Sequence, residues 1–209
     1  MILVTMIETM DNDIYFVPAS TTKAEIKVKG SKFIAGIFPI KSKNEAEAVY
    51  KDIKKKYYDA THNCFAYRID SNIYRYSDDG EPNGTAGKPI LQMIDNKELC
   101  EALCVVTRYF GGTKLGTGGL IRAYSDAAKE ALDKTKISKK IRRRQLFLTF
   151  SYDLENSIRK LLSAFNGKLE ESLYSEQIKM NVKIPESKVD LFKKEIIDIS
   201  NNTIKIKHP

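Results

Sequence analysis

The chain of 209 residues is 42% apolar and 30% charged, a composition that predicts a folded globular protein and excludes a disordered one. Its net charge of +8 and pI near 9.2 favour anionic partners, with nucleic acid and phosphorylated small molecules as the main candidates. Three cysteines make no disulfide framework, which indicates a reducing compartment. The apolar run of residues 1–7 is too short to span a membrane, so we expect a cytoplasmic protein with no membrane partner.

The first third of the chain predicts a β-hairpin followed by a helix. Apolar residues alternate in part over residues 14–40, and Gly30 with the serine after it provides a turn. Ser42 and Glu45 have the spacing of a capping box, which indicates a helix start. This amphipathic helix carries lysines on its outer side and has an apolar stripe made of Ala46, Val49, Tyr50, Ile53 and Tyr57.

The middle of the chain alternates between strand and helix. Residues 62–76 have strand character, and residues 85–94 follow as a short helix. Residues 104–110 form a compact apolar strand that leads through a glycine-rich loop into a second helix. The apolar stripe of that helix consists of Leu120, Tyr124, Ala127, Ala128, Ala131 and Leu132.

The last third predicts a separate domain. A basic stretch, residues 134–144, shifts the composition and is interpreted as the boundary between domains 1–138 and 139–209. After it, strand and helix patterns alternate in the order βαββαβ. Such an order in about 60 residues is that of a ferredoxin-like split βαβ domain, so the whole chain is predicted to be α+β.

Two glycine-rich loops within residues 76–122 contain eight of the eleven glycines of the chain. The second loop precedes a helix, where converging backbone amides and the helix dipole favour an anion. It has neither the Walker nor the Rossmann spacing, and a tight structural crossover without a ligand is the alternative. The predicted phosphate-binding or nucleic-acid-binding residues are Lys88, Arg108, Lys114, Gly116, Gly118, Gly119 and Arg122.

The first loop concentrates three carboxylates, Asp78, Asp79 and Glu81. They could hold Mg²⁺ or serve as acid–base groups, although no metal site or cofactor is otherwise indicated. They could instead accept hydrogen bonds from backbone amides in turns, with Thr85 capping the following helix. A third use is bracing, in which one of these carboxylates pairs with Arg108 or with the arginine at position 122 of the second loop.

Histidine and cysteine give weaker signals. His62 stands at a strand entrance, as a general base, an RNA-facing group or a satisfied structural histidine. Cys64 and Cys104 lie in apolar strand patterns, and no Cys-x-x-Cys pair is present. We therefore interpret these cysteines as buried thiols and not as metal ligands.

Three segments together resemble the YigZ/IMPACT family. They are Asp59-Ala60-Thr61-His62-Asn63-Cys64, then Ser77-Asp78-Asp79-Gly80-Glu81-Pro82 through Gly84-Thr85-Ala86-Gly87, and Val106-Thr107-Arg108-Tyr109-Phe110-Gly111-Gly112 through Gly118-Gly119-Leu120. The resemblance implies a first domain folded like the C-terminal domain of small-subunit ribosomal protein five. It also implies a second domain like the last domain of elongation factor G, as in the bacterial two-domain YigZ branch.

The resemblance implies an RNA-associated or ribosome-associated regulator of translation or stress response. Eukaryotic members resemble the chain only in the first domain and contain a separate regulatory module. The role of that module is therefore not expected for this sequence. The same first-domain fold occurs in small-molecule kinases, so an enzyme that acts on a phosphorylated small molecule or nucleotide with a divalent metal is the alternative. The leading hypothesis is that residues 77–88 and 108–122 form one groove that binds phosphates, and that the C-terminal domain adds a basic sheet surface.

Overall fold

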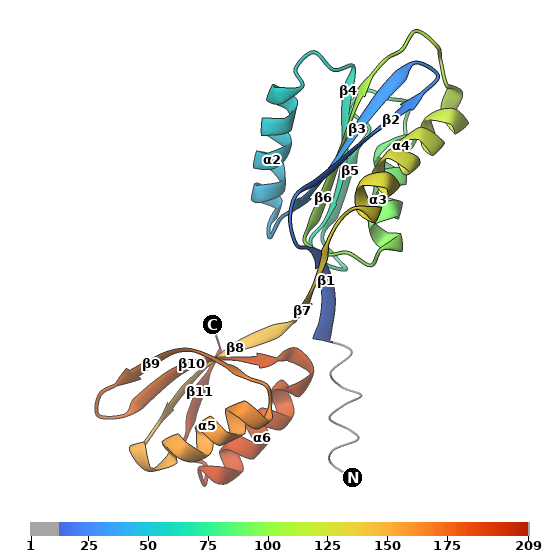
Figure 1. The fold of residues 1–209 in the computed structure, drawn as a ribbon. Helices are drawn as coiled ribbons and strands as arrows, with labels where there is room; N and C mark the ends of the chain where they lie inside the picture. Colours follow the sequence, from blue (N-terminus) through green and yellow to red (C-terminus); the bar gives the residue numbers. More distant parts are fainter. Residues whose placement is uncertain (1–12, 209) are drawn as a thin grey trace. The chain divides into compact units, whose positions relative to one another are not determined.

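The computed structural model describes residues 13–208. The run of residues 1–7 that was interpreted above lies outside this range. The described chain forms two compact units, one of residues 15–139 and one that joins residues 13–14 to residues 140–208. Figure 1 shows both units as mixtures of helices and strands, which confirms the predicted α+β class.

The first unit is built on an antiparallel sheet of five strands in the order β2-β3-β6-β4-β5. Its strands are β2 (Thr22–Val28), β3 (Ser31–Pro39), β4 (His62–Arg68), β5 (Tyr74–Ser77) and β6 (Ala102–Tyr109). The predicted hairpin is present: Lys29 and Gly30 both have positive φ, +44° and +81°, as a two-residue turn of the primed type requires.

Helices cover both faces of this sheet (Figure 1). Helices α3 (Gly87–Asn96) and α4 (Gly116–Asp133) pack on one face, and α2 (Lys43–Lys56) packs on the other. The alternation of side chains along β6 explains the two cores, because Cys104 and Val106 join the α3–α4 side while Leu103 and Val105 join the α2 side. Every residue of the predicted stripe on α4 is buried.

Helix α2 begins where the capping box predicts. Ser42 is extended, and its hydroxyl oxygen accepts a hydrogen bond from the amide of Glu45. The carboxylate of Glu45 reaches back to the amide of Lys41, one residue earlier than a standard capping box would place it. Two of the free amides at the start of this segment are thus satisfied locally.

The basic stretch between the units is not an irregular linker. It forms β7 (Ile137–Ile141), which pairs with β1 (Ile14–Pro18) in a sheet of two strands, and it then enters β8 (Arg143–Phe150). Alternation is weak in this stretch because few of its residues are apolar, so the sequence pattern did not reveal β7. Strand β1 lies within residues 14–40, where the pattern predicted two strands and the structure has three.

The second unit has the predicted βαββαβ order, with a four-stranded antiparallel sheet arranged β11-β8-β10-β9. Its elements are β8 (Arg143–Phe150), α5 (Glu155–Ala164), β9 (Lys168–Tyr174), β10 (Ile178–Pro185), α6 (Val189–Ile199) and β11 (Lys205–Lys207), with short 3₁₀ turns at Tyr152–Leu154 and Glu186–Lys188. One face of the sheet packs with both helices in a separate apolar core. None of the described helices is long and apolar enough to cross a membrane.

Candidate functional site

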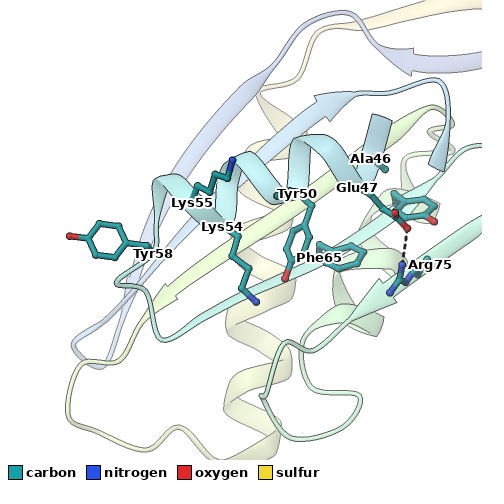
Figure 2. Close-up of a pocket in the computed structure, with 10 residues that line it drawn as sticks. Ala46, Glu47, Tyr50, Lys54, Lys55, Tyr58, Phe65 and Arg75 are labelled. Carbon is teal, nitrogen blue, oxygen red and sulfur yellow. Dashed lines mark hydrogen bonds and ion pairs between the residues drawn. The ribbon is translucent and has the colours of Figure 1, made fainter. Parts of the chain in front are cut away.

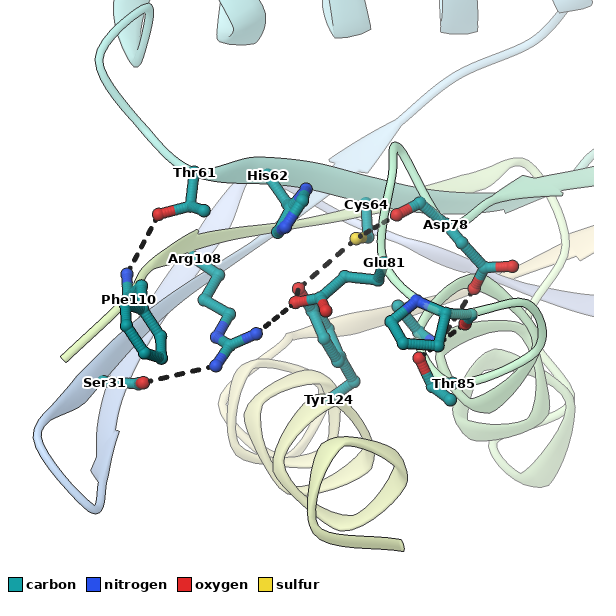
Figure 3. Close-up of polar contacts among 12 residues, drawn as sticks. Ser31, Thr61, His62, Cys64, Asp78, Glu81, Thr85, Arg108, Phe110 and Tyr124 are labelled. Atoms are coloured by element: carbon teal, nitrogen blue, oxygen red, sulfur yellow. Dashed lines mark hydrogen bonds and ion pairs between the residues drawn. The ribbon is translucent and has the colours of Figure 1, made fainter. Parts of the chain in front are cut away.

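The two glycine-rich loops meet at one end of the five-stranded sheet (Figure 3). Arg108 lies near the end of β6, and its Nη1 donates to the Glu81 carboxylate of the first loop at 2.5 Å. Both side chains are almost fully buried, with Arg108 5% and Glu81 8% exposed. Because both side chains are shielded from water, this charge-assisted hydrogen bond is strong. It joins segments 27 positions apart and holds the two loops against each other. This is the bracing contact that the sequence offered as its third alternative.

Other side chains complete this cluster. The hydroxyl of Tyr124 on α4 donates to the same Glu81 oxygen at 2.8 Å, and the thiol of Cys64 donates to the carbonyl of Asp78 at 3.0 Å. Burial raises the pKa of Tyr124 and of Cys64, so both stay protonated at neutral pH. Ser31 accepts from Arg108 Nη2 at 3.4 Å and from the amide of Gly111 at 3.1 Å. The cluster therefore ties helix α4, the first hairpin and both loops together.

Asp78 organises the backbone of the first loop. Its two carboxylate oxygens accept hydrogen bonds from the amides of Gly84, Ala86 and Gly87, at 2.9, 3.0 and 2.8 Å. Helix α3 begins at Gly87, so this carboxylate satisfies amides at its N-terminus from eight or nine positions away. The prediction that Thr85 caps this helix is wrong, because the Thr85 hydroxyl donates to the Pro82 carbonyl.

Replacing Asp78 with alanine is expected to lower the free energy of unfolding by about 2 kcal/mol, because three amides lose a charged acceptor. Urea unfolding followed by circular dichroism measures the change. Asp52→Ala, at an exposed position of α2, is the matched control and should stay within about 0.5 kcal/mol of the parent. An equal response of the two variants would contradict the role given to Asp78.

Asp79 and His62 fix the other side of the first loop. Asp79 has a positive φ of +42°, and its carboxylate accepts from the amide of Asn63 at 2.7 Å and from Lys54 at 2.9 Å. The hydrogen bond with Asp79 raises the pKa of Lys54. His62 Nδ1 lies 2.8 Å from the carbonyl oxygen of Asp79, and because a carbonyl only accepts, Nδ1 carries the proton. Among the predicted roles of His62, this contact is that of a satisfied structural histidine.

All three carboxylates of the first loop thus have partners within the protein. Asp78 binds amides, Asp79 binds an amide and a lysine, and Glu81 binds an arginine and a tyrosine. Within residues 13–208, no group of three or more histidine, cysteine, aspartate or glutamate side chains is arranged to hold a metal. These contacts agree with two of the uses predicted from the sequence, namely acceptance of hydrogen bonds in turns and bracing of the loops. Binding of Mg²⁺ by these carboxylates stays a prediction.

The remaining predicted cations lie at the surface. Lys88 in the first turn of α3, Lys114 in the second loop and Arg122 on α4 are exposed, and none of them forms an ion pair with another described residue. Arg108 differs from them, because burial with Glu81 gives it a bracing role. The exposed cations with the start of α4 are called the loop surface below.

The start of α4 adds backbone donors to the loop surface. Gly116 and Gly118 are exposed and Gly119 is half-buried, and no side chain of the described chain caps this end of the helix. Gly116 has a positive φ of +72°, which brings the chain into the helix with open space around the first turn. Uncapped amides and the helix dipole favour negative charge here.

Sequence reasoning missed three members of the buried cluster. Tyr124 was counted only as an apolar stripe residue, and Cys64 and Ser31 were given no polar role. One signal was available for Tyr124, because a tyrosine hydroxyl in a buried stripe requires a hydrogen-bond partner. Cys64 and Cys104 are buried thiols, as predicted.

Comparisons with known proteins agree with this architecture. Residues 29–132 match the family described as Impact N-terminal domain, and residues 148–203 match a domain of unknown function, DUF1949. The Bacillus subtilis protein called IMPACT family member YvyE is 35% identical over 92% of this chain and 90% of its own length. The Escherichia coli protein called IMPACT family member YigZ is 32% identical over 92% of this chain and 96% of its own length.

One further relative matches about half of the chain, and a solved structure matches nearly all of it. The Dictyostelium discoideum protein called Protein IMPACT homolog is 38% identical, but over 48% of this chain and 30% of its own length. A solved structure titled "Crystal structure of an hypothetical protein" has a TM-score of 0.69 at 31% identity and covers 94% of this chain and 98% of its own. The fold and the braced loops define a two-unit α+β protein. The chain belongs to the IMPACT family, as its loop segments predicted.

Proposed function

We propose that this protein is an RNA-associated or ribosome-associated regulator of translation that binds RNA phosphates at the loop surface. The observation that carries the proposal is the set of exposed cations Lys88, Lys114 and Arg122, which lack ion-pair partners in the described chain and accompany an uncapped helix start. Phosphate oxygens are the acceptors that such amides and cations prefer. The buried Arg108–Glu81 pair holds the two loops in place without contacting the ligand.

Exposed aromatic side chains and the second unit add support. Tyr74 and Tyr76 on the edge strand β5 are 53% and 42% exposed, and unstacked bases can stack on such rings. In the second unit, Phe147 is 39% exposed and pairs across the sheet with Asn181 and with Lys207. An aromatic ring among polar and basic groups on an open sheet is a common arrangement for single-stranded RNA.

The proposal is tested by binding of a single-stranded RNA oligonucleotide of mixed sequence, measured by fluorescence anisotropy. A Lys88→Ala/Lys114→Ala/Arg122→Ala variant is expected to bind roughly tenfold more weakly or worse near 0.1 M salt. The effect should be about equal for different sequences, because phosphate contacts carry no base information.

The matched control removes the same number of positive charges elsewhere in the first unit. Lys41, Lys43 and Lys56 are exposed and form no ion pair within residues 13–208, so their triple alanine variant should bind within about twofold of the parent. Equal losses for the two triple variants would mean that net charge alone attracts RNA, and the loop surface would not be the site.

A further inference from the structure

A pocket of about 800 Å³ lies on the α2 face of the five-stranded sheet, which is the face opposite α3 and α4 (Figure 2). This volume is within the range of about 300 to 1,000 Å³ that is usual for small-molecule sites. The loop surface belongs to the other helical layer, so the pocket is a separate feature of the first unit.

The pocket follows from the spacing of residues on α2. Positions 46, 50 and 54 form one row and positions 47, 51 and 55 form the next, because residues four apart stand above one another on a helix. The sheet contributes Phe65 and Tyr67, which are two residues apart on β4 and therefore point to the same face. It also contributes Arg75 of β5, which lies opposite Tyr67. The two rows and these strands line the pocket, which is open to solvent.

Aromatic rings form much of the pocket wall. The ring centroids of Tyr50 and Phe65 are 4.4 Å apart. The rings of Phe65 and Tyr67 are nearly parallel, with an interplanar angle of 7° and centroids 6.3 Å apart. Tyr58, two residues past the end of α2, also lines the pocket and is 85% exposed. Phe65 and Tyr67 are buried and form the floor of the pocket, so a planar aromatic group would stack chiefly on the half-buried ring of Tyr50.

Cations surround this aromatic wall. Lys54 is paired with Asp79 at 2.9 Å, and Arg75 is paired with Glu47 at 3.1 Å at the exposed rim. Lys51 and Lys55 have no ion-pair partner in the part of the chain that the structure describes. Because they are four residues apart on one helix, the two like charges destabilise α2 slightly unless an anion lies between them. The lining therefore has four cations against one carboxylate.

From these observations we infer that the pocket binds a nucleoside phosphate, with the base against Tyr50 and the phosphate between Lys51 and Lys55. A neutral aromatic molecule would leave the two lysines unpaired, and inorganic phosphate would leave the half-buried Tyr50 and the exposed Tyr58 uncovered. The exposed Arg75–Glu47 pair contributes little to stability, so Arg75 is available to exchange its partner for the phosphate. The nucleoside phosphate is either a free nucleotide or one residue of an RNA strand.

The test is a titration of ¹⁵N-labelled full-length protein with adenosine 5′-monophosphate, followed by amide chemical shifts. We expect saturable shifts at α2, β4 and β5, with adenosine and inorganic phosphate each binding at least tenfold more weakly. A Lys51→Glu/Lys55→Glu variant should bind the nucleotide roughly tenfold more weakly or worse. Both lysines are exposed, so this variant is expected to fold. Lys56→Glu, on the same helix but outside the pocket, is the control and should bind like the parent.

A parallel titration with a tetramer of adenylate distinguishes the two sources. Saturation by the tetramer at lower concentration than by the mononucleotide assigns the pocket to RNA, and the reverse assigns it to a free nucleotide. Absence of saturable shifts with both probes, or unchanged binding by Lys51→Glu/Lys55→Glu, would overturn the inference. The Lys88→Ala/Lys114→Ala/Arg122→Ala variant should still bind the mononucleotide, so the failure of one proposal is distinguishable from the failure of the other.

Discussion

Glu81→Gln is expected to lower the free energy of unfolding of the first unit by about 3 to 5 kcal/mol. The substitution keeps the shape of the side chain but leaves the guanidinium of Arg108, which is 5% exposed, without its counter-charge. The Nε atom of Arg108 already lacks a hydrogen-bond partner among the described residues, so little compensation is available. Calorimetry should show the melting temperature of this unit fall by roughly 10 °C or more.

Two further variants separate the buried pair from a general loss of charge. Glu47→Gln makes the same change in the exposed pair with Arg75, whose side chains are 58% and 57% exposed, and it should cost less than about 1 kcal/mol. The double variant Glu81→Leu/Arg108→Met should recover part of the stability, because no buried charge remains. If Glu81→Gln costs no more than Glu47→Gln, the Arg108–Glu81 contact does not brace the loops.

Gly111→Ala is the second substitution with a large expected effect, about 3 kcal/mol of destabilisation. A methyl group on Gly111 would overlap the backbone of Gly30 and Ser31, where the second loop crosses the turn of the first hairpin. Backbone atoms cannot move aside as a flexible side chain can, so the loop itself must shift. The hydrogen bond from the Gly111 amide to Ser31 would be lost at the same time.

Gly118→Ala is the matched control in the same loop and helix. Apart from its chain neighbours and the backbone of its own helix, no atom of the described residues lies within 4 Å of the position where its Cβ would be, and its φ is not positive. Alanine is favoured over glycine within a helix by up to about 1 kcal/mol, so this variant should be neutral or slightly stabilised. Equal melting temperatures of the two variants would contradict the close crossing at Gly111.

Most of the fold could be predicted because its apolar residues repeat with clear periods. The stripe on α4 and the alternation along β10 place each side chain on a defined face, and Ser42 defines a helix start through local contacts alone. Strand β7 was missed because the basic stretch has too few apolar residues to show alternation, and β1 was missed because its apolar run, Ile14–Pro18, was grouped with the two strands of the hairpin. Pairing of two strands that lie more than 100 residues apart in the sequence is made by backbone hydrogen bonds, which leave no pattern in the sequence.

The candidate site was predicted in part, for a related physical reason. Glycine density identified the two loops, and the possible pairing of Glu81 with Arg108 followed from opposite charges. The choice among several cations and carboxylates depended on burial, which the sequence does not give. The α2 pocket was missed because lysines on an amphipathic helix indicate a solvated outer face, and nothing local places that face beside Phe65 and Arg75.

The central claim, phosphate binding at the loop surface, is tested most directly by the salt dependence of RNA affinity. For single-stranded RNA, each phosphate contact contributes roughly 0.7 to the slope of log affinity against log salt concentration. The Lys88→Ala/Lys114→Ala/Arg122→Ala variant should therefore have a slope shallower than that of the parent by about 2. The Lys41→Ala/Lys43→Ala/Lys56→Ala control should keep the parental slope. Identical slopes for the parent and the loop-surface variant would contradict the account.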